Sequence, residues 1–166
     1  METVDGIEMQ FAVNVLAYFW MMEAFTPVLS ASAPARIVNV ASYWAGDLDL
    51  DDLEMKERSY SNNTAYRQSK QADRMLTAAF AARLRESGIT VNACHSGDVN
   101  SKLSNDLGFG GGEQPADGAD TPLWLALDSK GGVHSGAYFE HRAEVPCRFA
   151  ADADAVDRLY AICAGY

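Results

Sequence analysis

A tyrosine and a lysine one helical turn apart form the chemically most suggestive pair in this sequence. Tyr66 and Lys70 lie in an amphipathic, alanine-rich segment that predicts a helix over residues 64–87, so both side chains share one face, with Cβ atoms about 6 Å apart. A tyrosine titrates near pH 10, and lowering its pKa to about 7 requires roughly 4 kcal/mol in favour of the phenolate. A lysine ammonium at about 4 Å supplies energy of that order at an effective dielectric constant of about 20. The pair therefore suits proton transfer to or from an alcohol oxygen.

Two further polar residues stand where the same chemistry would need them. Ser42 ends a run of β-branched residues that predicts a buried strand over residues 36–42, and ligands of open α/β sheets bind beyond such strand ends. A hydroxyl there can hold a substrate carbonyl beside a tyrosine, although a serine at a strand end can also be purely structural. Asn14 interrupts an apolar run, and an amide is costly to bury unpaired. It either makes a structural hydrogen bond to the backbone or helps to hold a water near a lysine.

Elements of alternating type must position these residues. The first helix is apolar almost all round, which predicts packing on more than one side, with Trp20, Met21 and Met22 in the core. Its longest apolar run, residues 11–22, is shorter than the roughly 20 residues that a membrane span requires. Alternating strands and helices predict parallel strands joined by right-handed crossovers. We expect strands at 36–42, 89–94 and 137–139, helices at 6–30, 64–87, 119–127 and 152–164, and a glycine-rich loop at 97–118.

The order of these motifs resembles the short-chain dehydrogenase/reductase family. Asn14, Ile-Val-Asn-Val-Ala-Ser42, Tyr66-x-x-x-Lys70 and Val-Asn-Ala-Cys-His-Ser-Gly97 follow one another as they do in that family. The long gap between Ser42 and Tyr66 and the closing Ser-Gly-Ala-Tyr-Phe139 are similar to its retinol-dehydrogenase-like branch. The resemblance covers essentially the whole chain. It implies an α/β fold, the C-terminal part of a doubly wound Rossmann-type parallel sheet of about three strands, in a single partial domain over residues 1–166.

The resemblance also implies a role for each motif residue. Tyr66 would be the general acid/base, Ser42 would orient the carbonyl, and Asn14 would support a proton-relay water. Lys70 would lower the pKa of the tyrosine and hydrogen-bond the nicotinamide ribose. The implied cofactor is NAD or NADP, and the implied reaction is hydride transfer between it and a small alcohol or carbonyl substrate. Besides Tyr66 and Lys70, the cofactor-binding residues would be Gly97, Val99 and Ser101.

The sequence departs from the family pattern at its start. The family opens with a strand, a glycine-rich turn and a helix that hold the pyrophosphate, and these 166 residues contain no such pattern. Gly108 to Gly112 follows no strand, and we interpret it as a mobile substrate loop. Two hypotheses remain open: an incomplete oxidoreductase, or a truncated, non-catalytic interaction or regulatory module. In either case we expect weak or no NAD(P) binding by this chain alone.

Composition limits the partners and the compartment. The net charge of -10 excludes the basic stripe that nucleic acids require and disfavours an anionic membrane surface. Cys94, Cys147 and Cys163 are odd in number and have no CxxC spacing, which predicts no metal site and a cytoplasmic location. We expect no membrane span. By resemblance, helices 6–30 and 64–87 would form the interface of a homo-oligomer.

Overall fold

A mostly parallel sheet forms the centre of the molecule. The computed structural model describes residues 1–106 and 108–166, and its strands lie in the order β1-β2-β3-β4. β1 (Ala35–Val40) pairs in parallel with β2 (Ile89–Cys94) from Ala35↔Ile89 to Val40↔Cys94. β3 (Tyr138–Glu140) continues the parallel sheet. The expected α/β class is confirmed. A fourth strand, β4 (Ala143–Val145), pairs antiparallel to β3 and was not predicted, because three mostly exposed residues carry no periodic signal.

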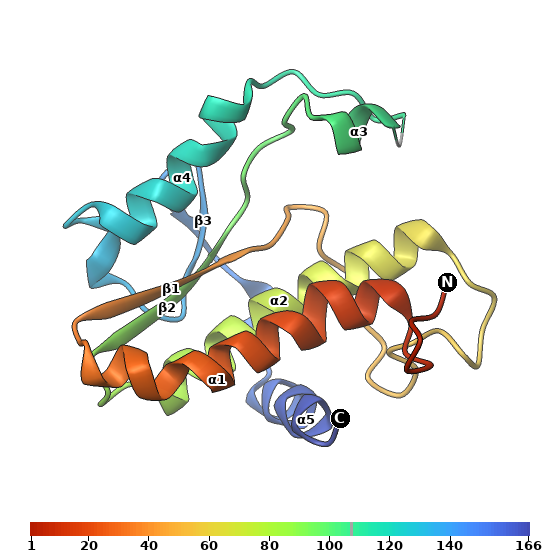
Figure 1. Ribbon diagram of the computed structural model, residues 1–166, viewed down its shortest axis with the longest axis horizontal. Coiled ribbons are helices and arrows are strands. Elements are labelled where there is room, and N and C mark those ends of the chain that lie inside the picture. The colour runs from red at the N-terminus through yellow and green to blue at the C-terminus, as the bar shows by residue number, and fades with distance from the viewer. Residues whose placement is uncertain (107) are drawn as a thin grey trace.

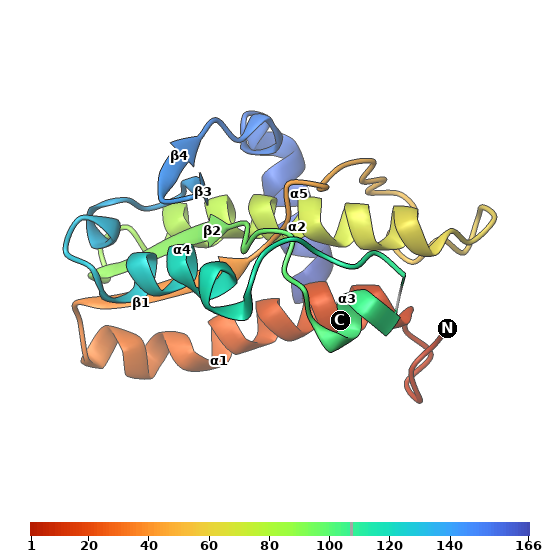
Figure 2. The same ribbon diagram turned by 90° about the horizontal axis from the view of Figure 1, so that it is seen from above.

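Helices cover both faces of this sheet. The two longest, α1 (Ala17–Ala31) and α2 (Asn62–Arg83), lie side by side on one face (Figures 1 and 2). α4 (Pro115–Leu127) covers the opposite face, and α5 (Ala153–Ala164) packs against α2. The short α3 (Lys102–Asp106) lies within the predicted loop. In chain order the helical elements are the π-helix η1 (Phe11–Leu16), α1 (Ala17–Ala31), α2 (Asn62–Arg83), α3 (Lys102–Asp106), α4 (Pro115–Leu127), the 3₁₀ turns η2 (Gly131–Val133) and η3 (Arg148–Ala150), and α5 (Ala153–Ala164).

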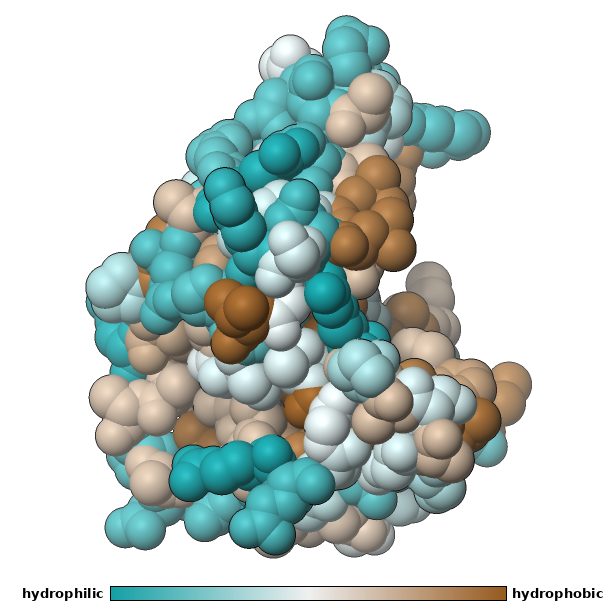
Figure 3. Space-filling model, turned by 90° about the vertical axis from the view of Figure 1, so that its left-hand side faces the viewer, coloured by the Kyte–Doolittle hydropathy of each residue, from teal (hydrophilic) through white to brown (hydrophobic). Residues whose placement is uncertain are grey.

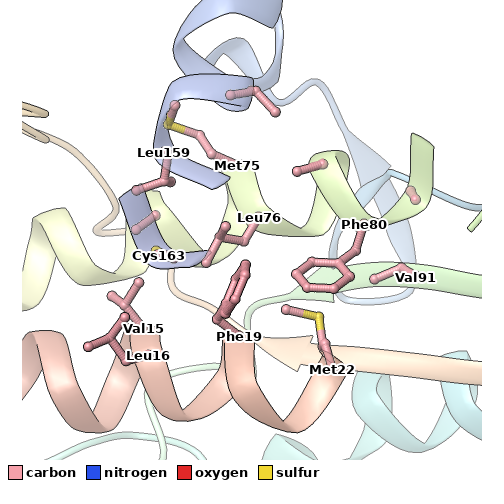
Figure 4. Close-up of a cluster of buried hydrophobic side chains, with 14 of the residues drawn as sticks. Val15, Leu16, Phe19, Met22, Met75, Leu76, Phe80, Val91, Leu159 and Cys163 are labelled. Atoms are coloured by element: carbon pink, nitrogen blue, oxygen red, sulfur yellow. The ribbon is translucent and has the colours of Figure 1, made fainter. Parts of the chain in front are cut away.

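The main hydrophobic core lies between α1, α2 and α5. Figure 4 shows side chains from these three helices pointing toward one another. Phe19 and Phe80 meet edge to face with ring centroids 5.4 Å apart. Burying one such side chain is worth about 1.5–3 kcal/mol, so this cluster fixes α2 against its neighbours. Its central members are Val15, Leu16, Phe19, Met22, Met75, Leu76, Phe80, Leu159 and Cys163.

The first helix contacts both β1 and α2 but leaves its other side exposed, so the prediction that Trp20 and Met21 lie in the core is wrong. Met22 is buried as expected, but Trp20 is 44% exposed and Met21 50% exposed. The reason is that β1 is an edge strand, with no strand beyond it among the described residues. Figure 3 shows a surface hollowed on one side, with hydrophobic residues flanking the hollow. By length and apolarity alone, the helix Phe11–Ala31 could cross a membrane, and the absence of a span stays a prediction.

Element boundaries shift where local chemistry sets them. α2 begins at Asn62 because the Ser61 hydroxyl caps it, accepting a hydrogen bond from Thr64 N at 3.3 Å. It ends at Arg83, before Gly88, which turns the chain into β2 with φ +72°. α4 starts at Pro115, four residues earlier than predicted, because proline suits the first turn of a helix. β1 ends at Val40, so Ser42 lies two residues beyond the strand.

Candidate active site

Lys70 is fixed beneath the carboxyl end of β1. It lies one turn after Tyr66 on α2 and is only 8% exposed. Its ammonium donates to the main-chain oxygen of Val40, the last residue of β1, at 3.0 Å, and to Asp73 Oδ2 at 2.9 Å. The ring of Tyr18, on α1, lies 5.3 Å from Nζ. Three elements therefore hold the lysine in one place.

The charge on Lys70 is maintained despite its burial. Desolvation alone would lower the pKa of a buried lysine. Here the Asp73 carboxylate, by charge and hydrogen bond, together with the neighbouring Tyr18 outweighs that cost, so the pKa of Lys70 is raised above its ordinary value. Lys70 is thus a cation at neutral pH, as the proposed support of a tyrosine phenolate requires.

Ser42 is buried and oriented by its neighbours. Its Oγ accepts a hydrogen bond from the main-chain N–H of Trp44 at 3.1 Å, which leaves its own proton free to be donated. Its main-chain oxygen accepts from Arg74 Nη2 at 2.6 Å. The Arg74 guanidinium lies 3.4 Å from the ring centroid of Tyr138, on β3. The loop after β1 is thereby tied to α2 and, through this stacking, to β3.

Asn14 is tied to the helix that carries Tyr66 and Lys70. It lies in the π-helix η1, and such wide turns recur at functional sites. Its Nδ2 donates to Ser69 Oγ at 3.0 Å, and Ser69 Oγ donates to the main-chain oxygen of Tyr66 at 2.8 Å. Asn14 therefore makes a structural hydrogen bond, but to a side chain of α2 and not to the backbone as predicted. A role in holding water stays a prediction.

The predicted cofactor-binding loop follows β2 and contains Gly97, Val99 and Ser101. It begins at the same carboxyl end of the sheet as Ser42, because Cys94 is paired with Val40. Gly97 has φ +84°, in the left-handed region that favours glycine, and it lies against the Glu113 carboxylate. Val99 forms a parallel bridge with Glu113. Ser101 Oγ accepts from Ser104 N at 3.1 Å, at the start of α3. The structure thus brings the predicted cofactor-binding loop to the strand end that also carries Ser42.

Aromatic side chains lie around the carboxyl ends of β1 and β2. The rings of Tyr43 and His95 lie 4.5 Å apart, and those of Trp44 and Phe109 lie 5.8 Å apart. Burial lowers the pKa of His95, which favours its neutral form. The predicted substrate loop therefore reaches the segment that follows Ser42 through Phe109. Residue 107, within the predicted loop 97–118, lies outside the described residues, and the mobility of Gly108 to Gly112 stays a prediction.

Two residues of this site were missed from the sequence. Asp73 pairs with Lys70, and Arg74 holds the Ser42 carbonyl. Both follow Tyr66 and Lys70 at helical spacing, so continuing the same face of the helix by one turn is the signal that could have found them.

Comparisons with known proteins identify the family and the fold. The family model described as short chain dehydrogenase matches residues 1–108. Human retinol dehydrogenase 13 is 35% identical over 96% of this chain and 54% of its own length, and human retinol dehydrogenase 14 is 36% identical over 84% and 46%. An uncharacterized protein from Mycobacterium Paratuberculosis has a crystal structure that superposes with a TM-score of 0.77, at 27% identity, over 98% of this chain and 60% of that chain. NADPH-bound carbonyl reductase from chicken fatty liver shares the fold, with a TM-score of 0.58 at 23% identity, over 87% and 60%.

The chain therefore belongs to the short-chain dehydrogenase family. Its similarity extends to retinol dehydrogenases, and it spans about half the length of these relatives.

Proposed function

We propose that this chain is the catalytic portion of an NAD(P)-dependent oxidoreductase that interconverts an alcohol and a carbonyl. One observation carries the proposal: Lys70, kept charged by Asp73, is fixed to the last carbonyl of β1, one turn from Tyr66 and two residues before Ser42. A proton-transfer tyrosine, a cation and a free hydroxyl thus come from neighbouring elements. The family and the names of its relatives support a reaction of this class.

The described residues fit the ribose end of a nicotinamide cofactor. The Lys70 ammonium has three N–H donors, of which Val40 and Asp73 take two, so one remains for a ribose hydroxyl. Gly97, Val99 and Ser101 follow β2 at the carboxyl end of the strands, the end at which Lys70 meets Val40. When bound, the nicotinamide supplies or accepts the hydride. Both NAD and NADP remain candidates.

The chain's own residues handle the proton. Ser42 donates its free hydroxyl proton to the substrate oxygen and holds it in place. Tyr66 accepts the proton of the alcohol during oxidation, or returns it during carbonyl reduction. Lys70, one helical turn after Tyr66, places a cation on the same face of α2 as the tyrosine. The substrate itself is not specified beyond a small alcohol or carbonyl compound.

Replacing the tyrosine hydroxyl tests this assignment. In an enzyme completed with a nucleotide-binding half, we expect Tyr66→Phe to lower turnover by at least about 100-fold while cofactor affinity changes little, because general acid/base groups contribute that much. Lys70→Ala should weaken both turnover and cofactor binding. Steady-state kinetics and a cofactor titration measure the two effects separately.

A matched control removes a tyrosine hydroxyl elsewhere. Tyr160 donates to Glu23 on an exposed part of α1, so Tyr160→Phe should leave turnover within about two-fold of the unmodified enzyme. If Tyr66→Phe retained more than about a tenth of the turnover, Tyr66 would not be the proton-transfer group.

A non-catalytic interaction module is the second candidate. The exposed apolar side of α1 and the free edge of β1 favour it, since both offer surface to a partner. We expect calorimetric titration of this chain with NAD⁺ or NADP⁺ to give no binding at micromolar concentrations, because it contains no pyrophosphate cradle. Micromolar binding would contradict that expectation and favour a chain that is catalytically competent by itself.

A further inference from the structure

Asp73 is a fully buried carboxylate whose only described partner is a lysine of the site. Its residue is 1% exposed, and Oδ2 accepts from Lys70 Nζ at 2.9 Å. The second oxygen, Oδ1, is buried and has no hydrogen-bond partner within residues 1–106 and 108–166. Leaving a buried acceptor unpaired costs free energy, and burying a charge costs more. An asparagine has the same shape and would avoid the buried charge. The negative charge of Asp73 therefore matters for its partner, Lys70.

Among the described residues, Lys70 is the one cation that acts on the pKa of Asp73. Tyr18 from α1 and Cys163 from α5 face it, and both are groups whose pKa its negative charge helps to raise. From β1 comes the Val40 carbonyl, which also carries partial negative charge and also accepts from Lys70. The Asp73 carboxylate and the Val40 carbonyl therefore both accept hydrogen bonds from the Lys70 ammonium.

We propose that Asp73 is a positioning residue of the Ser42–Tyr66–Lys70 site, whose carboxylate holds the Lys70 ammonium on the Val40 carbonyl and keeps it charged. The catalytic meaning of this role rests on the proposed function, while the ion pair itself does not. The carboxylate has to overcome the desolvation of Lys70, and without it burial would make Lys70 a weaker base than a lysine in water.

The Asp73–Lys70 ion pair is expected to form and break as the pH passes through the neutral range. Burial raises the pKa of Asp73 to about 7, although Lys70 acts in the opposite direction. Below that pH Asp73 is neutral and Lys70 loses its counter-charge, and above it both groups are charged. Protonation of Asp73 should therefore be visible at Lys70 itself.

Lysine NMR in this chain tests the proposal. The chain has four lysines, Lys56, Lys70, Lys102 and Lys130, and Lys70 is the buried one. With ¹³C-labelled lysine, we expect the Lys70 side chain to titrate above the usual lysine pKa in the unmodified chain. In Asp73→Asn its pKa should fall by at least about one unit, because the desolvation remains and the carboxylate charge is gone.

The exposed pair Lys102–Asp106 is the matched control. It has the same charges at helical spacing but lies in solvent on α3, so Asp106→Asn should leave the Lys70 pKa unchanged within about 0.3 unit. An unchanged Lys70 pKa in a folded Asp73→Asn chain, judged by its amide spectrum, would overturn the proposal.

A measurement on the unmodified chain covers the case in which the variant does not fold. The Lys70 pKa of the unmodified chain should lie above the ordinary lysine value, and a Lys70 pKa below that value would also overturn the proposal. Neither readout needs cofactor or turnover. Failure of the proposed oxidoreductase function would therefore leave the Lys70 result intact, and the two failures can be told apart.

Discussion

Buried cations on one face of α2 organise the strand ends around them. Lys70 reaches the last carbonyl of β1, and Arg74, one turn later, reaches the carbonyl of Ser42. Arg74 is 8% exposed and also lies over the ring of Tyr138. A single helix face therefore binds β1, the loop after it and a residue of β3. The positions of Ser42 and Lys70 depend on these side-chain to main-chain hydrogen bonds as much as on the sheet.

Removing the guanidinium of Arg74 should destabilise the molecule. We expect Arg74→Leu to lower the free energy of unfolding by about 2 kcal/mol, because the buried Ser42 carbonyl loses a charged donor and the aromatic stacking is lost. Urea denaturation followed by circular dichroism measures the change. The exposed Arg85→Leu is the control and should stay within about 0.5 kcal/mol. Equal effects of the two substitutions would show that the Ser42 carbonyl does not depend on Arg74.

Sequence spacing located Tyr66 and Lys70 but not the residues that support them. The i,i+4 relation is local, so it predicts a shared helix face without knowledge of the fold. Asp73 acts through Lys70, which donates to the Val40 carbonyl 30 residues away, and Arg74 donates to the Ser42 carbonyl 32 residues away. Such pairings depend on tertiary packing, which composition and periodicity do not encode.

At the scale of elements, the strongest periodic segments were predicted best. β2 has the bounds that the sequence predicted. α2 differs from the prediction only at its ends, because the Ser61 cap sets its first residue and the turn before Gly88 sets its last. The short α3 and β4 were missed, because elements of five and three residues have too few positions to show a period. α1 was assigned correctly as a helix, but its exposed side was not predicted, since an apolar sequence does not say whether a neighbour is present.

At the scale of the whole molecule, one side of the surface is unusually apolar. The free edge of β1 lies between the layers of α1 and α4, and Figure 3 shows hydrophobic residues flanking a hollow there. Phe25 and Val28 on α1 are each 56% exposed, and Leu127 on α4 is 77% exposed. Unpaired strand edges and large apolar patches promote association.

Self-association of this chain is therefore expected. We predict dimers or larger species at about tens of micromolar in sedimentation velocity, and we expect Phe25→Asp to shift the distribution toward monomer by placing a charge on the patch. Leu103→Asp, on the exposed α3, should not shift it. A stable, compact monomer of the unmodified chain at the same concentration would contradict the prediction.

The crossover between β1 and β2 also determines when the site can form. Ala35 pairs with Ile89, so the whole of α2 intervenes, and the described sheet has one local hairpin, β3–β4. Closing a long segment costs entropy before its contacts are made, and chains dominated by such contacts fold in about milliseconds to seconds. Ser42 precedes this crossover and Gly97 follows it. The site is therefore a late product of folding, and a nascent chain would acquire it only after β2 has been synthesised and has docked beside β1.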